Sequence, residues 1–373
     1  MSRGKSKNKI RYAVVGLGHI AQVAVLPAFK NATNSELVTL VSGEAKKLKK
    51  VGKKYCVEHV YSYDDYEQAL SDVDAVYIAL PNHLHREYAV RAAKAGVHVL
   101  CEKPMAVTAD ECQAMIEAAE ENNVKLMIAY RLHFEAANLE AIRLVKTGKL
   151  GDVRFFTSEF AQDVVPDNVR VTEPVERGGG PLYDMGVYCI NAARYLFRDE
   201  PTEVFATTSS NGEHRFRNVE EMTSVIMRFP KDQIAAFTCS FGAADIARYT
   251  LTGTKGTLTS DPAYEYAEPL KHQLKIGEKM KARTFPKRDQ FAAELVYFSD
   301  CILNGKNPEP SGLEGLADVR IVEAAYESAR TGKAIKLPEL PTKKRPTEQQ
   351  KIHRPAHGKP KTVNTKSPSG EAA

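Results

Sequence analysis

Three consecutive residues, Glu102, Lys103 and Pro104, directly follow an apolar run with strand character, Val97 to Cys101. In an open parallel sheet, groups just beyond the carboxyl ends of the strands face the ligand crevice. A lysine at this place can reach a bound substrate, and the proline would fix the direction in which it points. An ordinary strand end with solvated charges is the alternative interpretation of these three residues.

A second set of candidate residues lies on a predicted helix that follows a triple glycine at 178–180. Asp184, Tyr188 and Asn191 are separated by four and three residues, which predicts that they share one helix face. A free phenol has a pKa of about 10, and a nearby ammonium group favours its charged form. Lys103 and Tyr188 are therefore complementary as a proton-transfer pair, with Asp184 beside them to hold a substrate. A tyrosine packed in the core, with its hydroxyl satisfied, is the alternative.

A glycine-rich turn lies near the start of the chain. The strand pattern Ile10 to Val15 leads into Gly16-Leu17-Gly18-His19-Ile20-Ala21, and a helical segment follows from Gln22 to Lys30. The first glycine permits a tight turn, the second lets a pyrophosphate approach the backbone, and the small alanine allows close packing of helix on strand. The helix N-terminus offers amide donors to the phosphates. This strand-turn-helix context predicts dinucleotide binding.

The end of the second predicted strand bears on which dinucleotide is bound. Ser42 and Gly43 stand there, with Lys46 and Lys47 close behind. An NAD site usually places an acid at this position to accept hydrogen bonds from the ribose 2′-hydroxyl. A hydroxyl or amide donor with a cation suits a 2′-phosphate instead. The stretch therefore favours NADP over NAD. Glu44 argues against this preference, although this acid lies slightly late in the chain. The alternative for the lysines is that they only form the solvated face of a helix.

The elements that must position these residues fall into two types. Strands predicted at 36–41, 74–80, 97–100 and 125–129 alternate with helices, which is typical of a doubly wound parallel sheet with right-handed crossovers. In the second half, 222–229 and 233–241 are joined by a hairpin signal, and 248–258 is another. The predicted fold class is therefore α/β, with an N-terminal Rossmann sheet and a C-terminal α+β domain that has a large open, mainly antiparallel sheet. One face of that open sheet must be solvated or meet a second subunit.

We expect four segments along the chain: a disordered basic start at 1–8, an NADP-binding domain at 9–129, a C-terminal substrate and oligomerisation domain at 130–337, and a disordered basic tail at 338–373. The formal net charge of +5 comes from the two ends of the chain. The positive charge of the ends exceeds +5, so the remaining body of the chain has a net charge of about −6. The body therefore gives no support for a nucleic-acid groove, and no nucleic-acid partner is expected.

Composition narrows the class further. No apolar run is long enough to cross a bilayer, and no signal peptide is recognisable, so we expect no membrane partner and a cytoplasmic location. The six cysteines show no CxxC pairing and sit mostly in apolar runs, as buried free thiols do. His83 and His85 flank Leu84, but no third ligand lies near them in the sequence, so no metal site is predicted.

The motifs together carry a resemblance to a known family. Gly16-x-Gly18-x-x-Ala21, Pro81-Asn82-His83-Leu84-His85 and Glu102-Lys103-Pro104, at these separations, resemble the Gfo/Idh/MocA oxidoreductases. Val41-Ser42-Gly43, the stretch 126–131 and the Asp-x-Gly-x-Tyr at 184–188 are similar to the glucose–fructose oxidoreductase branch. Many members of the family have histidine where Tyr188 stands, which leaves the substrate less defined.

The resemblance implies a cofactor site, a sugar substrate and further features. The predicted catalytic residues are Lys103, Tyr188 and Asp184, and the predicted cofactor-binding residues are Gly16, Leu17, Gly18, His19, Ile20, Ser42, Gly43, Lys47, Tyr63, Leu80, Pro81, Asn82, His85, Glu102, Lys103 and Arg131. The resemblance also implies a cis bond before Pro104 and dimers or tetramers formed through the C-terminal sheet.

The predicted function is hydride transfer between NADP and a sugar or polyol. Tyr188 would take the proton of an aldose C1 hydroxyl to give a lactone, or donate a proton to a carbonyl in the reverse direction, while Lys103 orients the reacting oxygen. One alternative is an aldose–aldose oxidoreductase of the glucose–fructose type, in which NADP is not released. Another, from a different class, is a non-catalytic NADP-binding sensor, whose mark would be a broken Lys/Tyr pair beside an intact glycine turn.

Overall fold

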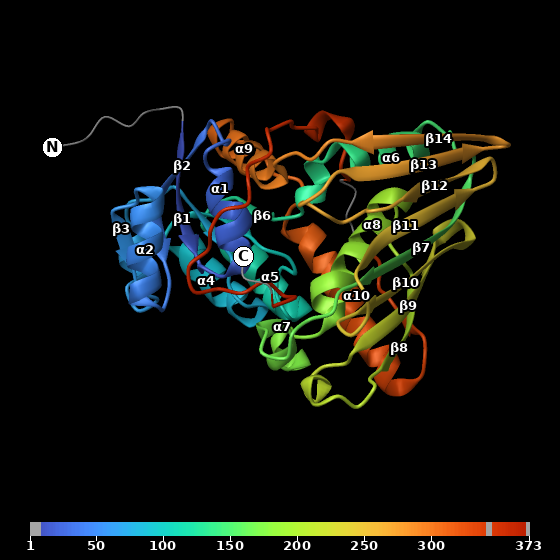
Figure 1. Cartoon of the computed structure of the whole chain (residues 1–373), viewed down its shortest axis with the longest axis horizontal. Helices are drawn as coiled ribbons and strands as arrows, with labels where there is room; N and C mark the ends of the chain where they lie inside the picture. The colour runs from blue at the N-terminus through green and yellow to red at the C-terminus, as the bar shows by residue number, and fades with distance from the viewer. Residues whose placement is uncertain (1–8, 341–344, 371–373) are drawn as a thin grey trace.

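The first half of the chain forms a parallel sheet of six strands in the order β3-β2-β1-β4-β5-β6 (Figure 1). The computed structural model describes residues 9–340 and 345–370, so the predicted disordered start at 1–8 lies outside the described residues. The strands are β1 (Ile10–Val15), β2 (Ser35–Val41), β3 (His59–Tyr61), β4 (Ala75–Ile78), β5 (His98–Cys101) and β6 (Leu126–Ile128). The order reverses between β1 and β4, and ligands of open parallel sheets bind at such a switch point.

Helices cover both faces of this sheet. They are α1 (Leu26–Ala28), α2 (Ala45–Tyr55), α3 (Tyr66–Leu70), α4 (His85–Lys94), α5 (Ala109–Glu121) and, from much later in the chain, α9 (Gln290–Leu303). Thr108 and Glu111 form a capping box that satisfies the first amides of α5. The predicted helix from Gln22 to Lys30 is instead a π-helical turn, Ala21–Val25, followed by the short α1. Pro27 lacks the backbone N–H that a regular helix would need at this point.

The second sheet has nine strands in the order β14-β13-β12-β11-β7-β10-β9-β8-β15. They are β7 (Val153–Ala161), β8 (Glu203–Ser209), β9 (Met222–Phe229), β10 (Gln233–Ser240), β11 (Ile246–Gly253), β12 (Gly256–Ser260), β13 (Leu270–Ile276), β14 (Lys279–Phe285) and β15 (Ile335–Lys336). β7 and β10 run parallel, and the other neighbouring pairs are antiparallel. Both sheets confirm the predicted fold class.

Three long helices cover one face of the second sheet: α6 (Ala136–Lys146), α8 (Val187–Phe197) and α10 (Gly312–Thr331). Figure 1 shows them between the second sheet and the first, with the short α7 (Val169–Thr172) at the lower edge. Their apolar side chains and the inner face of the sheet form a continuous buried core. The opposite face of the sheet is left uncovered within the described chain.

The tail differs from its prediction. Residues 338–373 were expected to be disordered, but the described part, 345–370, lies against both halves of the molecule. Arg345 and Gln350 are buried, and Gln350 donates hydrogen bonds to the backbone and the carboxylate of Glu309. Polar composition predicted disorder because it offers little apolar surface to bury, but here specific polar contacts hold the segment. Residues 341–344 and 371–373 lie outside the described residues.

The six cysteines are free thiols, five of them buried and Cys56 exposed, in agreement with the sequence pattern. Among the helices that the structure describes, none is long and apolar enough to cross a membrane.

Candidate active site

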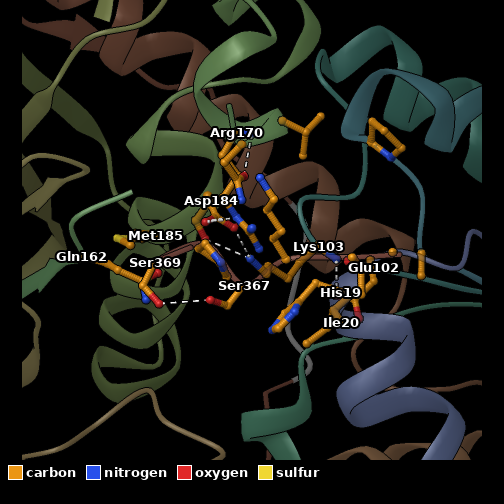
Figure 2. A pocket seen from close by; sticks show the side chains of 18 of the residues that line it. His19, Ile20, Glu102, Lys103, Gln162, Arg170, Asp184, Met185, Ser367 and Ser369 are labelled. Atoms are coloured by element: carbon orange, nitrogen blue, oxygen red, sulfur yellow. Dashed lines mark hydrogen bonds and ion pairs between the residues drawn. The ribbon is translucent and has the colours of Figure 1, made fainter. Parts of the chain in front are cut away.

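A cavity of about 1630 Å³ lies where the carboxyl ends of the parallel strands meet the second half of the chain. Every predicted catalytic and cofactor-binding residue lines it except His85. Figure 2 shows the middle of this cavity, with Lys103 between Asp184 on one side and His19 and Ile20 of the glycine turn on the other.

The glycine turn after β1 has the shape that a phosphate-bearing ligand needs. Gly16 has φ +94°, and a Cβ there would lie 2.4 Å from the carbonyl oxygen of Ala79, so only glycine fits. A Cβ on Gly18 would meet nothing within 4 Å, which places this residue at open cavity space. The Nδ1 atom of His19 is buried and has no hydrogen-bond partner among the described residues. An open backbone and an unpaired buried polar atom fit a dinucleotide pyrophosphate at this turn.

The end of β2 presents both a cation and an acid to the cavity. Lys47 Nζ lies 2.6 Å from Glu44 Oε1, and the Lys47 side chain is largely buried whereas Glu44 is half exposed. A Cβ on Gly43 would approach the ring of Tyr63 to 3.2 Å, so the ring packs directly over this glycine. The cavity therefore has a corner made of Ser42, Gly43 and Lys47, with Glu44 at its rim, at the strand end where Rossmann folds bind a ribose.

Lys103 projects from the end of β5 into the space between the two halves of the chain. Its Nζ donates to the carbonyl oxygen of Asp184 at 2.9 Å and to Asp184 Oδ1 at 3.2 Å, and it lies 4.5 Å from the centroid of the Tyr188 ring. Burial works to lower the pKa of Lys103, but Tyr188, Asp184 and Glu102 outweigh it and raise this pKa above its ordinary value. Lys103 is therefore an ammonium ion at neutral pH. Its peptide bond to Pro104 is cis, as the resemblance implied.

Asp184 is held between two cations. Arg170 Nε lies 2.6 Å from Asp184 Oδ2, opposite the contact with Lys103. Burial acts to raise the pKa of Asp184, but Arg170 and Lys103 lower it below its ordinary value. The carboxylate therefore stays charged and can accept hydrogen bonds from substrate hydroxyl groups.

Arg131 is a second cation beside Tyr188. One guanidinium nitrogen lies 3.4 Å from the Tyr188 hydroxyl and 2.6 Å from the carbonyl oxygen of Tyr264, and the other donates to Gln290 Oε1. The guanidinium carbon lies 5.3 Å from the centroid of the Tyr188 ring. Two cations, Lys103 and Arg131, thus lie beside this tyrosine.

A chain of buried acidic groups lies behind Lys103. The Tyr77 hydroxyl is 2.8 Å from Glu102 Oε1 and 2.8 Å from Glu294 Oε1. A phenol has one proton and can donate to only one of these oxygens, so the other contact requires a protonated carboxyl group. Burial, followed by the charge of Glu102, raises the pKa of Glu294 well above its ordinary value. Burial also raises the pKa of Glu102, against the lowering effect of Lys103. Glu294 is accordingly the neutral member of the chain.

The predicted helix face is broken at one point. Asp184 lies in a π-helical turn, Leu182–Gly186, and Tyr188 in the first turn of α8. Both residues reach the cavity, but Asn191 is buried away from it, and its Oδ1 accepts a hydrogen bond from His133 Nε2 at 2.8 Å. The wider spacing of a π turn changes the phase of the side chains, so a count of four and three did not keep all three together.

His85 was predicted to bind cofactor, and the structure places it elsewhere. It is fully buried, and its ring nitrogens lie 2.9 Å from the carbonyl oxygens of Pro104 and Leu80. Burial lowers the pKa of His85, so the ring is neutral and its single N–H donates to one of these two carbonyl oxygens. The ring therefore lies between the ends of β4 and β5 and does not line the cavity. Asn82 does line the cavity, and its amide donates to the carbonyl oxygen of Gly178 at 2.7 Å.

Several residues of the site were not found from the sequence. They include Arg170, Gln162, Tyr264, Glu265, Tyr266 and the tail residues 362 and 364–369. Arg170 lies in α7 on the loop that connects β7 to the triple glycine, where no periodic pattern predicts placement. The only sequence signal was a pair of arginines, Arg170 and Arg177, on either side of acidic residues before the triple glycine.

The fold and the cavity together define a dinucleotide-binding protein whose second domain completes the site. Residues 10–130 match the family model described as oxidoreductase family, NAD-binding Rossmann fold, and residues 138–259 match the GFO/IDH/MocA C-terminal domain. The chain belongs to the Gfo/Idh/MocA oxidoreductase family.

Similar proteins act on sugars. The chain is 30% identical over 338 residues to D-xylose 1-dehydrogenase [NADP(+)] of Haloarcula marismortui, which covers 88% of this chain and 94% of that relative. The solved aldose-aldose oxidoreductase from Caulobacter crescentus, complexed with glycerol, superposes with a TM-score of 0.84 and 39% identity, over 88% of this chain and all of that chain. A 3-ketoreductase from Actinomadura kijaniata in complex with NADP and TDP-benzene superposes with a TM-score of 0.79 and 26% identity, over 86% of this chain and 98% of that chain.

Proposed function

We propose that this protein transfers hydride between NADP and a sugar, with Lys103 and Tyr188 handling the proton. The observation that carries the proposal is the position of the Lys103 ammonium group, hydrogen-bonded to Asp184 and 4.5 Å from the Tyr188 ring, in a cavity whose other wall is the glycine turn. A charged amine, a phenol and a carboxylate at one point of a dinucleotide cavity suit a carbinol or carbonyl carbon as the reacting centre.

The chain's own residues divide the work as follows. In the oxidative direction, Tyr188 accepts the proton of the C1 hydroxyl of an aldose, with the cations Lys103 and Arg131 beside its ring. Lys103 also donates a hydrogen bond to the reacting oxygen. Asp184, fixed by Arg170, accepts hydrogen bonds from neighbouring sugar hydroxyls. NADP, when bound, supplies the hydride chemistry. In the reductive direction Tyr188 returns the proton to a carbonyl oxygen.

The preference for NADP rests on the end of β2. Lys47 is a largely buried cation at the ribose-binding corner, and Ser42 adds a hydroxyl donor. A 2′-phosphate would accept a charge-assisted hydrogen bond from Lys47 in place of Glu44. The similar D-xylose dehydrogenase uses NADP(+) by its name, and the 3-ketoreductase holds NADP, which supports the same preference here.

A screen of aldoses and polyols with NADP and NAD, followed by absorbance of the reduced nicotinamide, tests the function. We expect turnover with at least one aldose and NADP, and near-complete loss of it in Lys103→Ala and Tyr188→Phe. Near-normal turnover in either variant would show that the assigned proton pair is wrong. Tighter binding of NAD than of NADP to the apo-protein would reverse the cofactor preference.

The same purified protein and the same screen distinguish two alternative functions. Aldose–aldose oxidoreductase is the activity in the name of the similar Caulobacter crescentus protein. If this chain had that activity, sugars would interconvert without free NADPH, and mass analysis would find the cofactor in the purified protein. A non-catalytic NADP-binding sensor would bind NADP but turn over no sugar. The intact contacts of Lys103 and Tyr188 favour the enzyme over the sensor.

The uncovered face of the second sheet supports a homodimer or homotetramer. Phe155, Ile234, Ile226 and Phe205 are each more than 40% exposed there. Phe155 pairs with Ile234 across β7 and β10, and Ile226 pairs with Phe205 across β9 and β8, so the four form one apolar patch. Apolar patches of this kind are typical of interfaces between subunits. We expect Phe155→Lys with Ile226→Lys to lower the mass found by sedimentation, and Leu303→Lys, an exposed apolar residue on α9, to leave it unchanged.

A further inference from the structure

The end of the tail, residues 359–369, crosses the mouth of the cavity, and we call it the strap. The segment before it is anchored on the nucleotide-binding half: the carbonyl oxygen of Arg354 accepts from the Asp289 amide, and that of Pro355 accepts from the Asn31 side chain at 2.8 Å. Figure 1 shows the red tail descending past α9 and α1 and ending between the two halves of the molecule. Lys54 of α2 then donates to the carbonyl oxygen of Lys361.

A buried glutamine directly after the glycine turn fixes the middle of the strap. Gln22 is 1% exposed, and its amide nitrogen donates to the carbonyl oxygen of Val363 at 2.9 Å, while its amide oxygen accepts from the Val363 N–H at 2.7 Å. The same amide nitrogen donates to the carbonyl oxygen of Leu17 at 2.9 Å. All hydrogen-bonding groups of the side chain are therefore used, two of them on the strap, so this contact is specific in position and register.

The strap continues to the other half of the molecule. Lys366 Nζ lies 2.8 Å from Asp167 Oδ2, and the carbonyl oxygen of Pro368 accepts from the Val165 N–H at 3.0 Å. Between these two ends, residues 362 and 364–369 line the cavity. Figure 2 shows Ser367 and Ser369 beside Gln162 and Met185 of the second domain, across the cavity from the glycine turn. The strap thus joins both domains over the cavity.

The charge of the strap suits an anionic ligand. Residues 359–369 include three lysines and no acidic residue. Burial, together with the charges of Arg170 and of Lys359 in the strap, lowers the pKa of His19 in the glycine turn to about 4, so positive charge of the strap lies near this turn. Lys47, and to a smaller extent the side chain of Asn364 in the strap, lower the pKa of Glu44 at the ribose-binding corner. A dinucleotide with a pyrophosphate and a 2′-phosphate has the complementary negative charges at these places.

We propose that the strap is a part of the dinucleotide site that closes over bound NADP and slows its release. A dinucleotide leaving the cavity must displace the strap, which breaks the Gln22–Val363 pair and the Lys366–Asp167 ion pair. This inference rests on the NADP-binding part of the proposed function and is independent of the sugar and of the proton pair.

The test compares the full chain with a chain that ends at Gly358, which keeps the buried Arg345 and Gln350. NADPH is bound to each, and its fluorescence is followed after addition of excess NADP. We expect release about 10- to 100-fold faster from the shortened chain, since several polar contacts are lost together. Unchanged thermal unfolding of the apo-proteins shows that both are folded.

Equal release rates would overturn the proposal. Tighter NADPH binding by the shortened chain would also overturn it, because it would mean that the segment obstructs the site. Failure of the full chain to bind NADP or NAD would instead overturn the proposed function, and the strap with it.

Point variants separate the bridge from the rest of the tail. Lys366→Gln and Asp167→Asn should each speed release by a similar factor, and the double variant should add little, because both remove one ion pair. Lys351→Gln, an exposed lysine of the tail outside the strap, removes the same charge and should leave the release rate unchanged. If Lys351→Gln speeds release equally, the effect comes from the overall charge of the tail, and the proposed role of the Lys366–Asp167 ion pair is wrong.

Discussion

This molecule contains two buried clusters of charged side chains, which differ in their access to the cavity. The first, the Arg194 cluster, consists of Arg194, Glu200, Glu314, Asp318 and Arg345. The second, the Lys103 cluster, consists of Lys103, Asp184, Arg170, Glu102 and Glu294. Each contains cations between carboxylates, and each has strongly shifted pKa values. Only the Lys103 cluster opens onto the cavity.

The Arg194 cluster is closed on itself. The Arg194 side chain is fully buried, and its nitrogens lie 2.6 Å from Asp318, 2.7 Å from Glu200 and 3.1 Å from Glu314. Burial acts to lower the pKa of Arg194, but these carboxylates raise it well above its ordinary value. Burial raises the pKa of Asp318 to about 6, against the lowering effect of Arg194. Such a network fixes α8 on α10 and offers nothing to a ligand.

The Lys103 cluster has unused capacity on its cavity side. An ammonium group has three protons, and Lys103 donates two hydrogen bonds to described residues, both to Asp184. Asp184 is 21% exposed and Arg170 29%, whereas Arg194 and Asp318 are not exposed at all. A shifted pKa or deep burial therefore does not distinguish a candidate site from a structural network in this protein. The two clusters differ instead in their access to the cavity and in the hydrogen-bonding groups that they leave unused.

The largest expected effect is that of Lys103→Met on activity. We expect kcat/KM to fall by roughly 10³- to 10⁴-fold, because both the oxygen contact and the charge beside Tyr188 are lost. The free energy of unfolding should change much less, since Asp184 keeps its ion pair with Arg170 when Lys103 is replaced. Steady-state kinetics and chemical denaturation measure the two quantities, with Lys94→Met, an exposed lysine on α4, as the control. A large loss of stability without loss of kcat/KM would show that the Lys103 cluster, like the Arg194 cluster, has only a structural role.

Arg194→Met should have the opposite pattern. Removing one partner of a buried ion network leaves uncompensated carboxylates, so we expect the free energy of unfolding to fall by about 3–5 kcal/mol. Activity per folded molecule should be close to that of the unchanged protein. Denaturant unfolding and active-site titration check this, and loss of kcat in fully folded protein would contradict the structural role.

Lys47→Ala tests a cation at the rim of the cavity, intermediate between the two clusters. Loss of a charge-assisted hydrogen bond to a 2′-phosphate should weaken NADP binding by about 10- to 100-fold and leave NAD binding unchanged. Lys46→Ala is the matched control, because Lys46 is exposed and does not line the cavity. Fluorescence titration of both cofactors gives the result, and equal weakening of NADP and NAD binding would remove Lys47 from the 2′-phosphate site.

Counted per pH unit, the smallest expected effect is the pH dependence that Glu294 contributes. Its raised pKa means that the folded protein keeps a proton that the unfolded chain releases above about pH 4.5. The stabilisation is therefore complete below that pH and is lost as pH rises, by about 1.4 kcal/mol per pH unit up to the folded pKa. In Glu294→Gln this part of the slope should disappear, and in Glu120→Gln, an exposed glutamate of α5, it should remain. Unfolding free energies at several pH values from 5 to 8 measure it, and parallel slopes in all three proteins would show that Glu294 is charged.

The sequence by itself determined the parallel sheet, its glycine turn, and the strand ends that deliver Ser42 and Lys103 to one edge. These features follow from short-range signals: the period of apolar residues, the need for glycine at a tight turn, and the common edge at which parallel strands end. The three-residue β3 and the polar β13 and β14 were missed, because neither a run of three residues nor a lysine-rich strand has a clear apolar period.

Only the tertiary structure decided which of the candidate residues meet. A π turn kept Asp184 and Tyr188 at the cavity and sent Asn191 toward the Arg194 cluster. His85, in a motif of the cofactor domain, is buried with its ring between the carbonyl groups of Leu80 and Pro104 and does not line the cavity. Arg170 and the strap reach the cavity through contacts between residues 14 to more than 300 positions apart, such as Arg170 with Asp184 and Gln22 with Val363. Such contacts depend on how whole elements pack, and local sequence patterns contain no information about them.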